Sequence, residues 1–235
     1  MNRLATVSPN GRSLAPVTAG SASLAMLVDP HSPAAEAYRS LAANLQFAYA
    51  DRQLQTIGVT SAAEGEGKST TVANLAVALA QSGRRVIVVD ADLRRPGQHT
   101  LFGVAREDGL ARVLAGQDVG DLPLQDTAAP GVRLLGSGPS PANPLEALAS
   151  RRFDHTLALA RAQSDFVLVD MPPAGALADV AVVAPRLDGM LLVVSAGKTK
   201  RDLARRAREQ LERVNANVLG VVLTDVRADT KPYHY

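Results

Sequence analysis

The chain has 235 residues, of which 46% are hydrophobic and 20% are charged, so its composition is that of a globular protein with room for one α/β domain. Its formal net charge of +2 is weak support for a nucleic-acid partner, and we expect none. The absence of cysteine excludes disulfides and thiolate metal sites and fits a reducing cytoplasm. No apolar run reaches the roughly 18–20 residues that span a bilayer, and we expect no signal peptide, so any membrane role would come through a partner.

Residues 1–29 combine serine, proline, glycine and alanine with few large apolar residues, which predicts a flexible N-terminal arm. The folded domain is expected over residues 30–226. It begins with a helical pattern at residues 36–47, in which Glu36 and Arg39 are spaced three positions apart and can form an ion pair.

Residues 60–70, TSAAEGEGKST, follow a β-type run at 55–59 and open a helical pattern that Gly83 closes. A strand, a small-residue turn ending in Gly-Lys-Ser and a helix form the context of a phosphate-binding loop. Lys68 supplies a mobile positive charge for phosphates, and Ser69 offers a hydroxyl to Mg²⁺. The strict motif has glycine where this chain has Ala62, so the match is to the relaxed form. The residues expected to bind the nucleotide are Ala63, Glu64, Gly65, Glu66, Gly67, Lys68, Ser69 and Thr70.

Acidic residues end two continuous β-branched runs. The run 85–90 ends in Asp90 and is followed by Asp92, and the run 165–170 ends in Asp170. Ligands of open parallel sheets bind at the carboxyl ends of the strands. A polar loop that caps a strand is the ordinary alternative for each acid alone. Beside a phosphate-binding loop, we interpret the three acids as a set that holds Mg²⁺ or accepts a proton.

Further apolar runs at 132–136, 190–195 and 218–224 alternate with helical segments. The helical segments are expected at 99–116, 145–161 and from residue 198 onward. This alternation predicts an α/β fold with a doubly wound, mostly parallel sheet flanked by helices.

The segment 198–208 is rich in lysine and arginine, while Leu203, Ala207 and Leu211 form a stripe of helical spacing. We interpret the basic residues as a solvated helix face, with a docking patch for an acidic partner as the alternative. Residues 227–235 lack periodicity and predict a mobile tail, which contains Tyr233 and Tyr235.

The segments SAAEGEGKST, VIVVDADLRRP and FVLVDMPP resemble the Walker A, A′ and B motifs of bacterial tyrosine kinases of capsule and exopolysaccharide systems, with P-loop NTPase folds. The resemblance runs from about residue 32 to residue 226. It implies an ATP- and Mg²⁺-dependent cytoplasmic enzyme that phosphorylates protein tyrosines, including Tyr233 and Tyr235 in its own tail. It also implies ring-like self-association and a membrane-embedded polysaccharide chain-length regulator that recruits and activates the kinase.

Carried over by position, Lys68 and Ser69 hold phosphate and Mg²⁺, Asp92 and Asp170 serve the metal, and Asp90 accepts the tyrosine proton. The division of roles between Asp90 and Asp92 stays open. Glu36 and Arg39 match a subunit-contact pattern of the family whose last arginine is replaced by Ala42. The segment Thr224-Asp225 replaces an asparagine that begins the family's base-contacting segment, so the adenine contacts are not carried over.

Two other functions compete with this interpretation. A partitioning or positioning ATPase of the ParA/MinD type shares the fold, but its signature lysine is absent because Ala63 stands at that position. A weakly active nucleotide-binding subunit that regulates polysaccharide machinery is the second alternative, and the short supply of tail tyrosines favours it.

Overall fold

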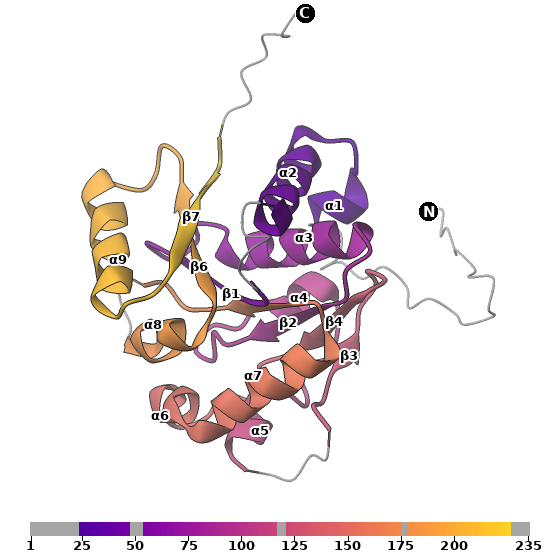
Figure 1. Ribbon diagram of the computed structural model, residues 1–235, viewed down its shortest axis with the longest axis vertical. Coiled ribbons are helices and arrows are strands. Elements are labelled where there is room, and N and C mark those ends of the chain that lie inside the picture. Colours follow the sequence, from indigo (N-terminus) through magenta and orange to yellow (C-terminus); the bar gives the residue numbers. More distant parts are fainter. Residues whose placement is uncertain (1–23, 48–53, 117–120, 175–177, 227–235) are drawn as a thin grey trace, which may run out of the picture.

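The computed structural model describes residues 24–47, 54–116, 121–174 and 178–226 (Figure 1). These residues form one seven-stranded sheet with the order β3-β4-β2-β5-β1-β6-β7. Neighbouring strands are parallel, except that the short β3 runs antiparallel to β4. The strands are β1 Thr56–Ser61, β2 Val86–Asp90, β3 Gln125–Asp126, β4 Val132–Leu135, β5 Phe166–Asp170, β6 Gly189–Ser195 and β7 Val218–Thr224.

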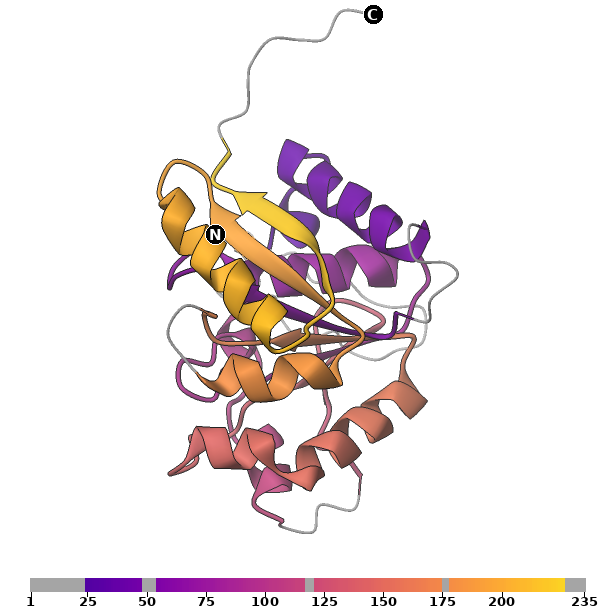
Figure 2. The same ribbon diagram turned by 60° about the vertical axis from the view of Figure 1, so that its left-hand side comes forward.

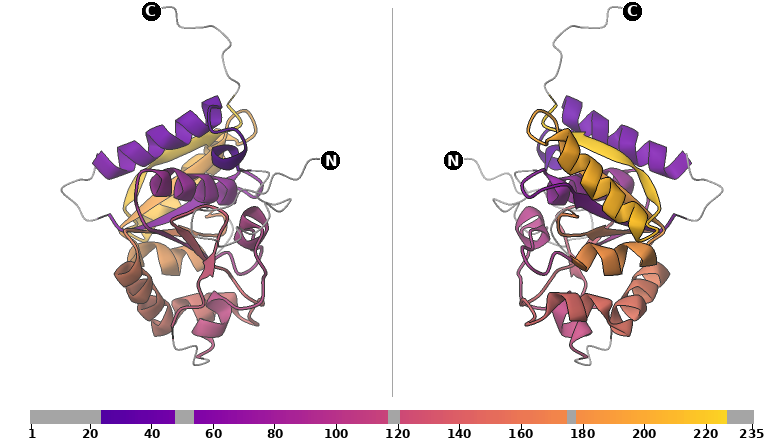
Figure 3. Two further views of the ribbon diagram at one scale, coloured as in Figure 1. Left: turned by 90° about the vertical axis from the view of Figure 1, so that its right-hand side faces the viewer. Right: turned by 90° about the vertical axis from the view of Figure 1, so that its left-hand side faces the viewer.

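Helices cover both faces of this sheet, which confirms the predicted doubly wound α/β fold (Figure 3). One layer contains α1 Ala25–Val28, α2 Pro33–Phe47, α3 Lys68–Gln81 and α4 Gln98–Phe102. The other contains α5 Leu110–Leu114, α6 Pro144–Ala149, α7 Arg151–Gln163, α8 Ala178–Val183 with the 3₁₀ turn Ala184–Arg186, and α9 Arg201–Arg213. β7 lies at one edge of the sheet beside α9 (Figure 2).

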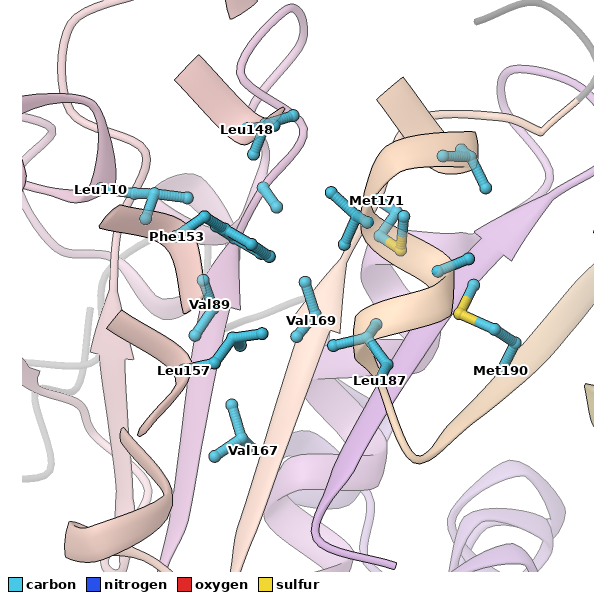
Figure 4. Close-up of a cluster of buried hydrophobic side chains, with 14 of the residues drawn as sticks. Val89, Leu110, Leu148, Phe153, Leu157, Val167, Val169, Met171, Leu187 and Met190 are labelled. Atoms are coloured by element: carbon cyan, nitrogen blue, oxygen red, sulfur yellow. The ribbon is translucent and has the colours of Figure 1, made fainter. Parts of the chain in front are cut away.

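The central strands are apolar on both faces because each face has its own helical layer. In β2, Val88 packs with α3, while Val89 faces the opposite layer. Figure 4 shows Phe153 and Leu157 of α7 lying over Val89 and Val169. Successive side chains along a strand point to opposite faces of the sheet and therefore enter different cores. This alternation fixes the register of the strands.

The N-terminal arm is shorter than predicted. Leu24 and Met26 are fully buried against the α2–α3 layer, and the backbone N–H of Met26 donates to Asn74 Oδ1 over 3.0 Å. Residues 24–29 therefore belong to the folded domain, because two large side chains and one buried backbone hydrogen bond hold this segment to α3. The rest of the expected arm lies outside the described residues.

The helix expected over residues 145–161 is wrong as a single element. The chain breaks at Ser150, which has extended backbone angles of φ −68° and ψ 154° and separates α6 from α7. Its hydroxyl donates to the carbonyl of Ala147 over 2.7 Å and so satisfies one of the carbonyls at the end of α6. The helical connection expected at 99–116, with Gly103, Gly109 and Gly116 as its punctuation, contains α4 and α5. Gly103 ends α4 with a left-handed φ of 67°, and Gly109 precedes α5.

The basic segment forms α9 with the predicted orientation. Ala207 and Leu211 are fully buried and Leu203 packs partly against the same core, which leaves the arginines of this helix exposed. The two-residue strand β3 was not predicted, because a segment this short carries no periodic pattern.

Candidate functional site

The loop between β1 and α3 has the backbone of a phosphate-binding turn. Gly65 and Gly67 adopt left-handed φ angles of 73° and 85°, which residues with a side chain rarely adopt. Gly67 is the N-cap of α3, and Lys68 is the first residue of that helix. The free N–H groups and the positive dipole end of α3 therefore lie at the lysine, where an anion is stabilised.

Lys68 contacts three of the other predicted site residues. Its Nζ lies 2.8 Å from Asp92 Oδ2 and 3.1 Å from Asp170 Oδ1, and it donates to Ser69 Oγ over 3.1 Å. The side chain of Lys68 is only 12% exposed. Burial lowers the pKa of Lys68, but the charges of Asp170 and Asp92 outweigh it and raise the pKa above its ordinary value.

Asp90 and Asp170 end adjacent strands in the same register, so their carboxyl groups are held side by side. Asp90 is fully buried, and burial together with the charge of Asp170 raises its pKa to about 8. Its Oδ2 accepts the backbone N–H of Gln98 over 3.0 Å. Its Oδ1 is buried without a hydrogen-bond partner in the described part of the chain.

Gln98 is a site residue that the sequence did not reveal. It is fully buried at the start of α4, and its Nε2 donates to Asp170 Oδ2 over 2.7 Å and to the carbonyl of Ser69 over 3.0 Å. Its Oε1 is buried and accepts no hydrogen bond from the described residues. The sequence could have indicated Gln98 only by its position six residues after Asp92. A neutral amide belongs to no charge pattern that would mark it as a site residue.

The side chain of Glu66 stabilises the phosphate-binding loop by hydrogen bonds. Its Oε2 accepts the backbone N–H of Ala63 over 2.9 Å, and its Oε1 accepts the hydroxyl of Thr199. The hydroxyl of Thr224 donates to the Glu66 carbonyl over 2.7 Å. The Glu66 side chain thus joins the loop to the segment after β6, and both of its carboxylate oxygens accept hydrogen bonds from the protein. Glu64, by contrast, is exposed and pairs with Arg95.

The segment Thr224-Asp225, which departs from the family pattern, connects two neighbouring parts of the fold. Asp225 has a left-handed φ of 54°, and its Oδ2 accepts Ser195 Oγ over 2.7 Å and Lys198 Nζ over 2.8 Å. These contacts hold the end of β7 to the segment that follows β6.

The buried Asp179 fixes the loop after β2. Arg94 Nε donates to Asp179 Oδ2 over 2.6 Å and Arg94 Nη2 to Oδ1 over 3.2 Å, a two-point contact across to α8. Asp92 accepts the backbone N–H of Arg95 over 3.0 Å, which orients its carboxylate toward Lys68. The sequence did not predict the role of Asp179, because it depends on contact with a distant segment.

The donor set fits Mg²⁺ that shares its coordination with a phosphate. Asp92, Asp170 and Ser69 supply the oxygen ligands that this cation prefers. Among the described residues, no group of three or more acidic or histidine side chains is arranged to hold a metal by itself. Mg²⁺ is usually bound through one or two carboxylates, water and substrate phosphate.

The predicted subunit-contact residues lie on α2. Arg39 Nε lies 2.9 Å from Glu36 Oε2, so the two residues form the expected ion pair, and Arg39 Nη2 donates to the carbonyl of Pro30 over 2.6 Å. Ala42 is only 2% exposed in the α2–α3 layer. The position where the family has its last arginine therefore faces the core here. Tyr233 and Tyr235 lie outside the described residues.

A cavity of about 390 Å³ lies at the opposite end of the strands, and is lined by residues such as Val86 at the start of β2 and Val132 at the start of β4. Lys68 and the acids lie at the carboxyl ends of the strands. This cavity is therefore separate from the phosphate-binding loop.

The chain matches the CobQ/CobB/MinD/ParA nucleotide binding domain family over residues 57–234. It is 40% identical over 197 residues to the tyrosine-protein kinase YwqD of Bacillus subtilis, an alignment that covers 84% of this chain and 83% of YwqD. The chain belongs to the bacterial tyrosine-protein kinases. It is also 33% identical over 200 residues to the tyrosine-protein kinase CpsD of Streptococcus agalactiae, across 84% of this chain and 86% of CpsD.

Solved structures agree with this family assignment. The kinase domain of the Escherichia coli tyrosine kinase ETK superimposes with a TM-score of 0.83 at 33% identity, over 90% of this chain and 83% of that one. The MinD protein of Pyrococcus horikoshii, complexed with Mg-ADP, gives a TM-score of 0.61 at 26% identity, over 72% of this chain and 69% of that one. The fold is thus shared with MinD, but the kinase domain is the better match. The resemblance inferred from the Walker motifs is confirmed.

Proposed function

We propose that this kinase transfers the γ-phosphoryl group of ATP, in the presence of Mg²⁺, to Tyr233 and Tyr235 of its own C-terminal segment. The observation that carries the proposal is the meeting of Lys68, Ser69, Asp92 and Asp170 at the N-terminus of α3. Phosphoryl transfer needs positioning and neutralisation of charge more than covalent help, and this site offers both.

Each residue has a defined task in this proposal. Lys68 and the N–H groups of the loop bind the β- and γ-phosphates, while Asp92, Asp170 and Ser69 hold Mg²⁺. Mg²⁺ supplies neutralisation of the phosphate charge when it is bound. The tyrosine oxygen forms a bond to the γ-phosphorus, the bond from that phosphorus to the leaving ADP breaks, and the phenolic proton passes to a carboxylate.

Asp90 is our candidate for the proton acceptor. Its pKa is raised to about 8, so its ionised carboxylate is a stronger base than an ordinary aspartate. Its full burial and its contact with Gln98 mean that a tyrosine reaches it only if the loop after β2 opens. Asp92 is the alternative acceptor, and separate Asp90→Asn and Asp92→Asn variants distinguish the two.

The setting of the enzyme is also proposed. The resemblance implies a cytoplasmic kinase that a membrane-embedded chain-length regulator recruits in capsule or exopolysaccharide synthesis, and a ring-like homo-oligomer with Glu36 and Arg39 at its contacts. No helix of the described residues is long and apolar enough to cross a membrane. EpsB of Ralstonia solanacearum, named a putative tyrosine-protein kinase, is 37% identical over 206 residues, which cover 88% of this chain but only 28% of EpsB.

The test is peptide mapping after incubation of the full chain with Mg-ATP. We expect phosphate on the peptide that contains Tyr233 and Tyr235, and none in the Lys68→Met variant. The Tyr233→Phe/Tyr235→Phe variant should keep ATP binding but gain no tail phosphate. ATP hydrolysis without phosphotyrosine, even with the cytoplasmic segment of a chain-length regulator fused to the chain, would leave the regulatory nucleotide-binding subunit as the better description.

A further inference from the structure

Helix α9 and the residues before it carry an excess of positive charge that the kinase site does not use. Residues 198–213 contain seven lysines and arginines against three acids. Ion pairs engage three of the cations: Lys198 with Asp225, Arg205 with Asp202, and Arg208 with Glu212.

The other cations of this segment are free to bind a ligand. Lys200, Arg201, Arg206 and Arg213 are all exposed and form no ion pair with any described residue. They are distributed around the exposed side of the helix from its N-cap to its last residue, and we call these four residues the α9 cationic face. Arginine binds phosphate through two parallel hydrogen bonds, so this face offers guanidinium groups in the form that suits a phosphate monoester.

The last described residues of the chain lie beside the segment that leads into α9. Lys198 Nζ lies 2.8 Å from Asp225 Oδ2, and the N–H of Ala196 donates to the carbonyl of Thr224 over 2.8 Å. These contacts place the end of β7 next to the segment that leads into α9. Figure 1 shows α9 beginning at the same end of the sheet at which β7 ends.

The remaining length of chain is sufficient for both tyrosines to reach the face. Tyr233 follows Val226, the last described residue, by seven positions, a reach of up to about 23–25 Å in an extended chain. The thirteen residues of α9 span about 20 Å. The tail is therefore long enough to extend along the helix from the end of β7.

We propose that the α9 cationic face binds the phosphorylated tail of this chain, an inference that rests on the tail phosphorylation proposed above. The side chains of residues 227–235 carry two positive charges and one negative charge, so the unmodified tail is not attracted to a basic helix. Each phosphate adds about −1.5 to −2 charges. Phosphorylation of both tyrosines thus reverses the sign of the tail and turns weak repulsion into attraction.

The test uses synthetic tail peptides, so that it does not depend on kinase activity. Fluorescent peptides of residues 227–235, with both tyrosines phosphorylated or with neither, are titrated with the full-length Tyr233→Phe/Tyr235→Phe protein and followed by anisotropy. We expect the phosphorylated peptide to bind at least about tenfold more tightly than the unmodified one, with an affinity that falls as salt rises.

Variants locate the binding. Arg201→Gln/Arg206→Gln should weaken phosphopeptide binding about tenfold, and Arg201→Lys/Arg206→Lys should restore part of it. Arg84→Gln/Arg151→Gln removes two exposed arginines elsewhere and should leave the affinity within about twofold. Thermal unfolding of all three variants should match that of the parent protein.

Other outcomes overturn the proposal. Loss of phosphopeptide binding in the Lys68→Met protein, with no loss in Arg201→Gln/Arg206→Gln, would place the peptide in the kinase site. Sedimentation with phosphatidylserine vesicles that depends on Arg201 and Arg206, without phosphopeptide binding, would assign the face to an anionic membrane. The phosphates are introduced by synthesis, so a failure of the phosphopeptide to bind leaves the autokinase proposal intact. If the kinase does not phosphorylate its tail, the peptide-binding experiment can still be interpreted.

Discussion

The side-chain amide of Gln98 donates to Asp170 Oδ2 over 2.7 Å, while the backbone N–H of the same residue donates to Asp90 over 3.0 Å. One neutral residue at the start of α4 thus holds the acids that end β2 and β5. The same amide contacts the carbonyl of Ser69 in the first turn of α3. The geometry of the site therefore depends on a third segment besides the phosphate-binding loop and the acidic strand ends.

Substitution of Gln98 tests this positioning role. A hydrogen bond to a charged group contributes about 1.5–3 kcal/mol, so Gln98→Leu should lower the phosphorylation rate by about tenfold or more. Because Asp170 loses its orientation, the Mg²⁺ concentration that gives half the maximal rate should rise. The control is Gln125→Leu, which removes an amide on β3 away from the site. An unchanged rate and Mg²⁺ dependence in Gln98→Leu would contradict the role.

Lys68 should stabilise the metal-free fold as well as serve the reaction. Lys68→Met leaves Asp92 and Asp170 without their cation, and breaking a buried pair costs about 3–5 kcal/mol, somewhat less here because Lys68 is partly exposed. We expect a lower urea midpoint in the metal-free variant and a larger gain in stability from added Mg²⁺ than in the parent. Lys200→Met, on an exposed residue, should show neither effect. Equal midpoints for Lys68→Met and the parent would rule out this account.

The ionisation of Asp90 should appear in the pH dependence of stability. Its pKa rises from 3.8 in the unfolded chain to about 8 in the fold, so the protonated form stabilises the fold at low pH and this stabilisation is lost as pH rises toward 8. Asp90→Asn does not titrate. The metal-free variant should therefore gain stability relative to the parent between about pH 5 and about pH 8, by at least about 1.4 kcal/mol.

Urea unfolding at several pH values measures this difference. Asp165→Asn is the control, because Arg85 lowers the pKa of Asp165 and its contribution changes only in the acid range. A difference between Asp90→Asn and the parent that is constant over this range would show that Asp90 remains ionised in the fold.

The two glutamates of the phosphate-binding loop should behave differently. Glu66 is 5% exposed and accepts hydrogen bonds from Ala63 and Thr199, so Glu66→Ala should loosen the loop and raise the KM for ATP several-fold. Glu64 is exposed and pairs only at the surface, so Glu64→Ala should change KM by less than about twofold. Titration of a fluorescent ATP analogue compares the two variants. Equal effects of the two substitutions on KM would show that the hydrogen bonds of Glu66 do not matter for ATP binding.

The fold and the charged part of the site could be predicted because their signals are local. The apolar runs that end in Asp90 and Asp170 gave the buried strands, and parallel pairing then brought their acids to one edge. Lys68 and Ser69 follow a turn whose glycines need left-handed angles, which the spacing of the motif already predicted.

The remaining features depend on contacts between distant segments. Gln98, Asp179 and the carboxylate of Glu66 are ordinary polar residues in the sequence, and only their partners on other elements show what they hold. The break at Ser150 was missed because the flanking residues on both sides favour helix. The burial of Leu24 and Met26 was missed because two apolar residues in a small-residue segment make no periodic pattern.

The most direct test of tail autophosphorylation is the amount of phosphotyrosine on the purified full-length protein after incubation with Mg-ATP, measured by intact mass and assigned by fragmentation. The account predicts one or two phosphates on Tyr233 and Tyr235, with none in the Lys68→Met protein. Consumption of ATP with no phosphate on either tyrosine would contradict it.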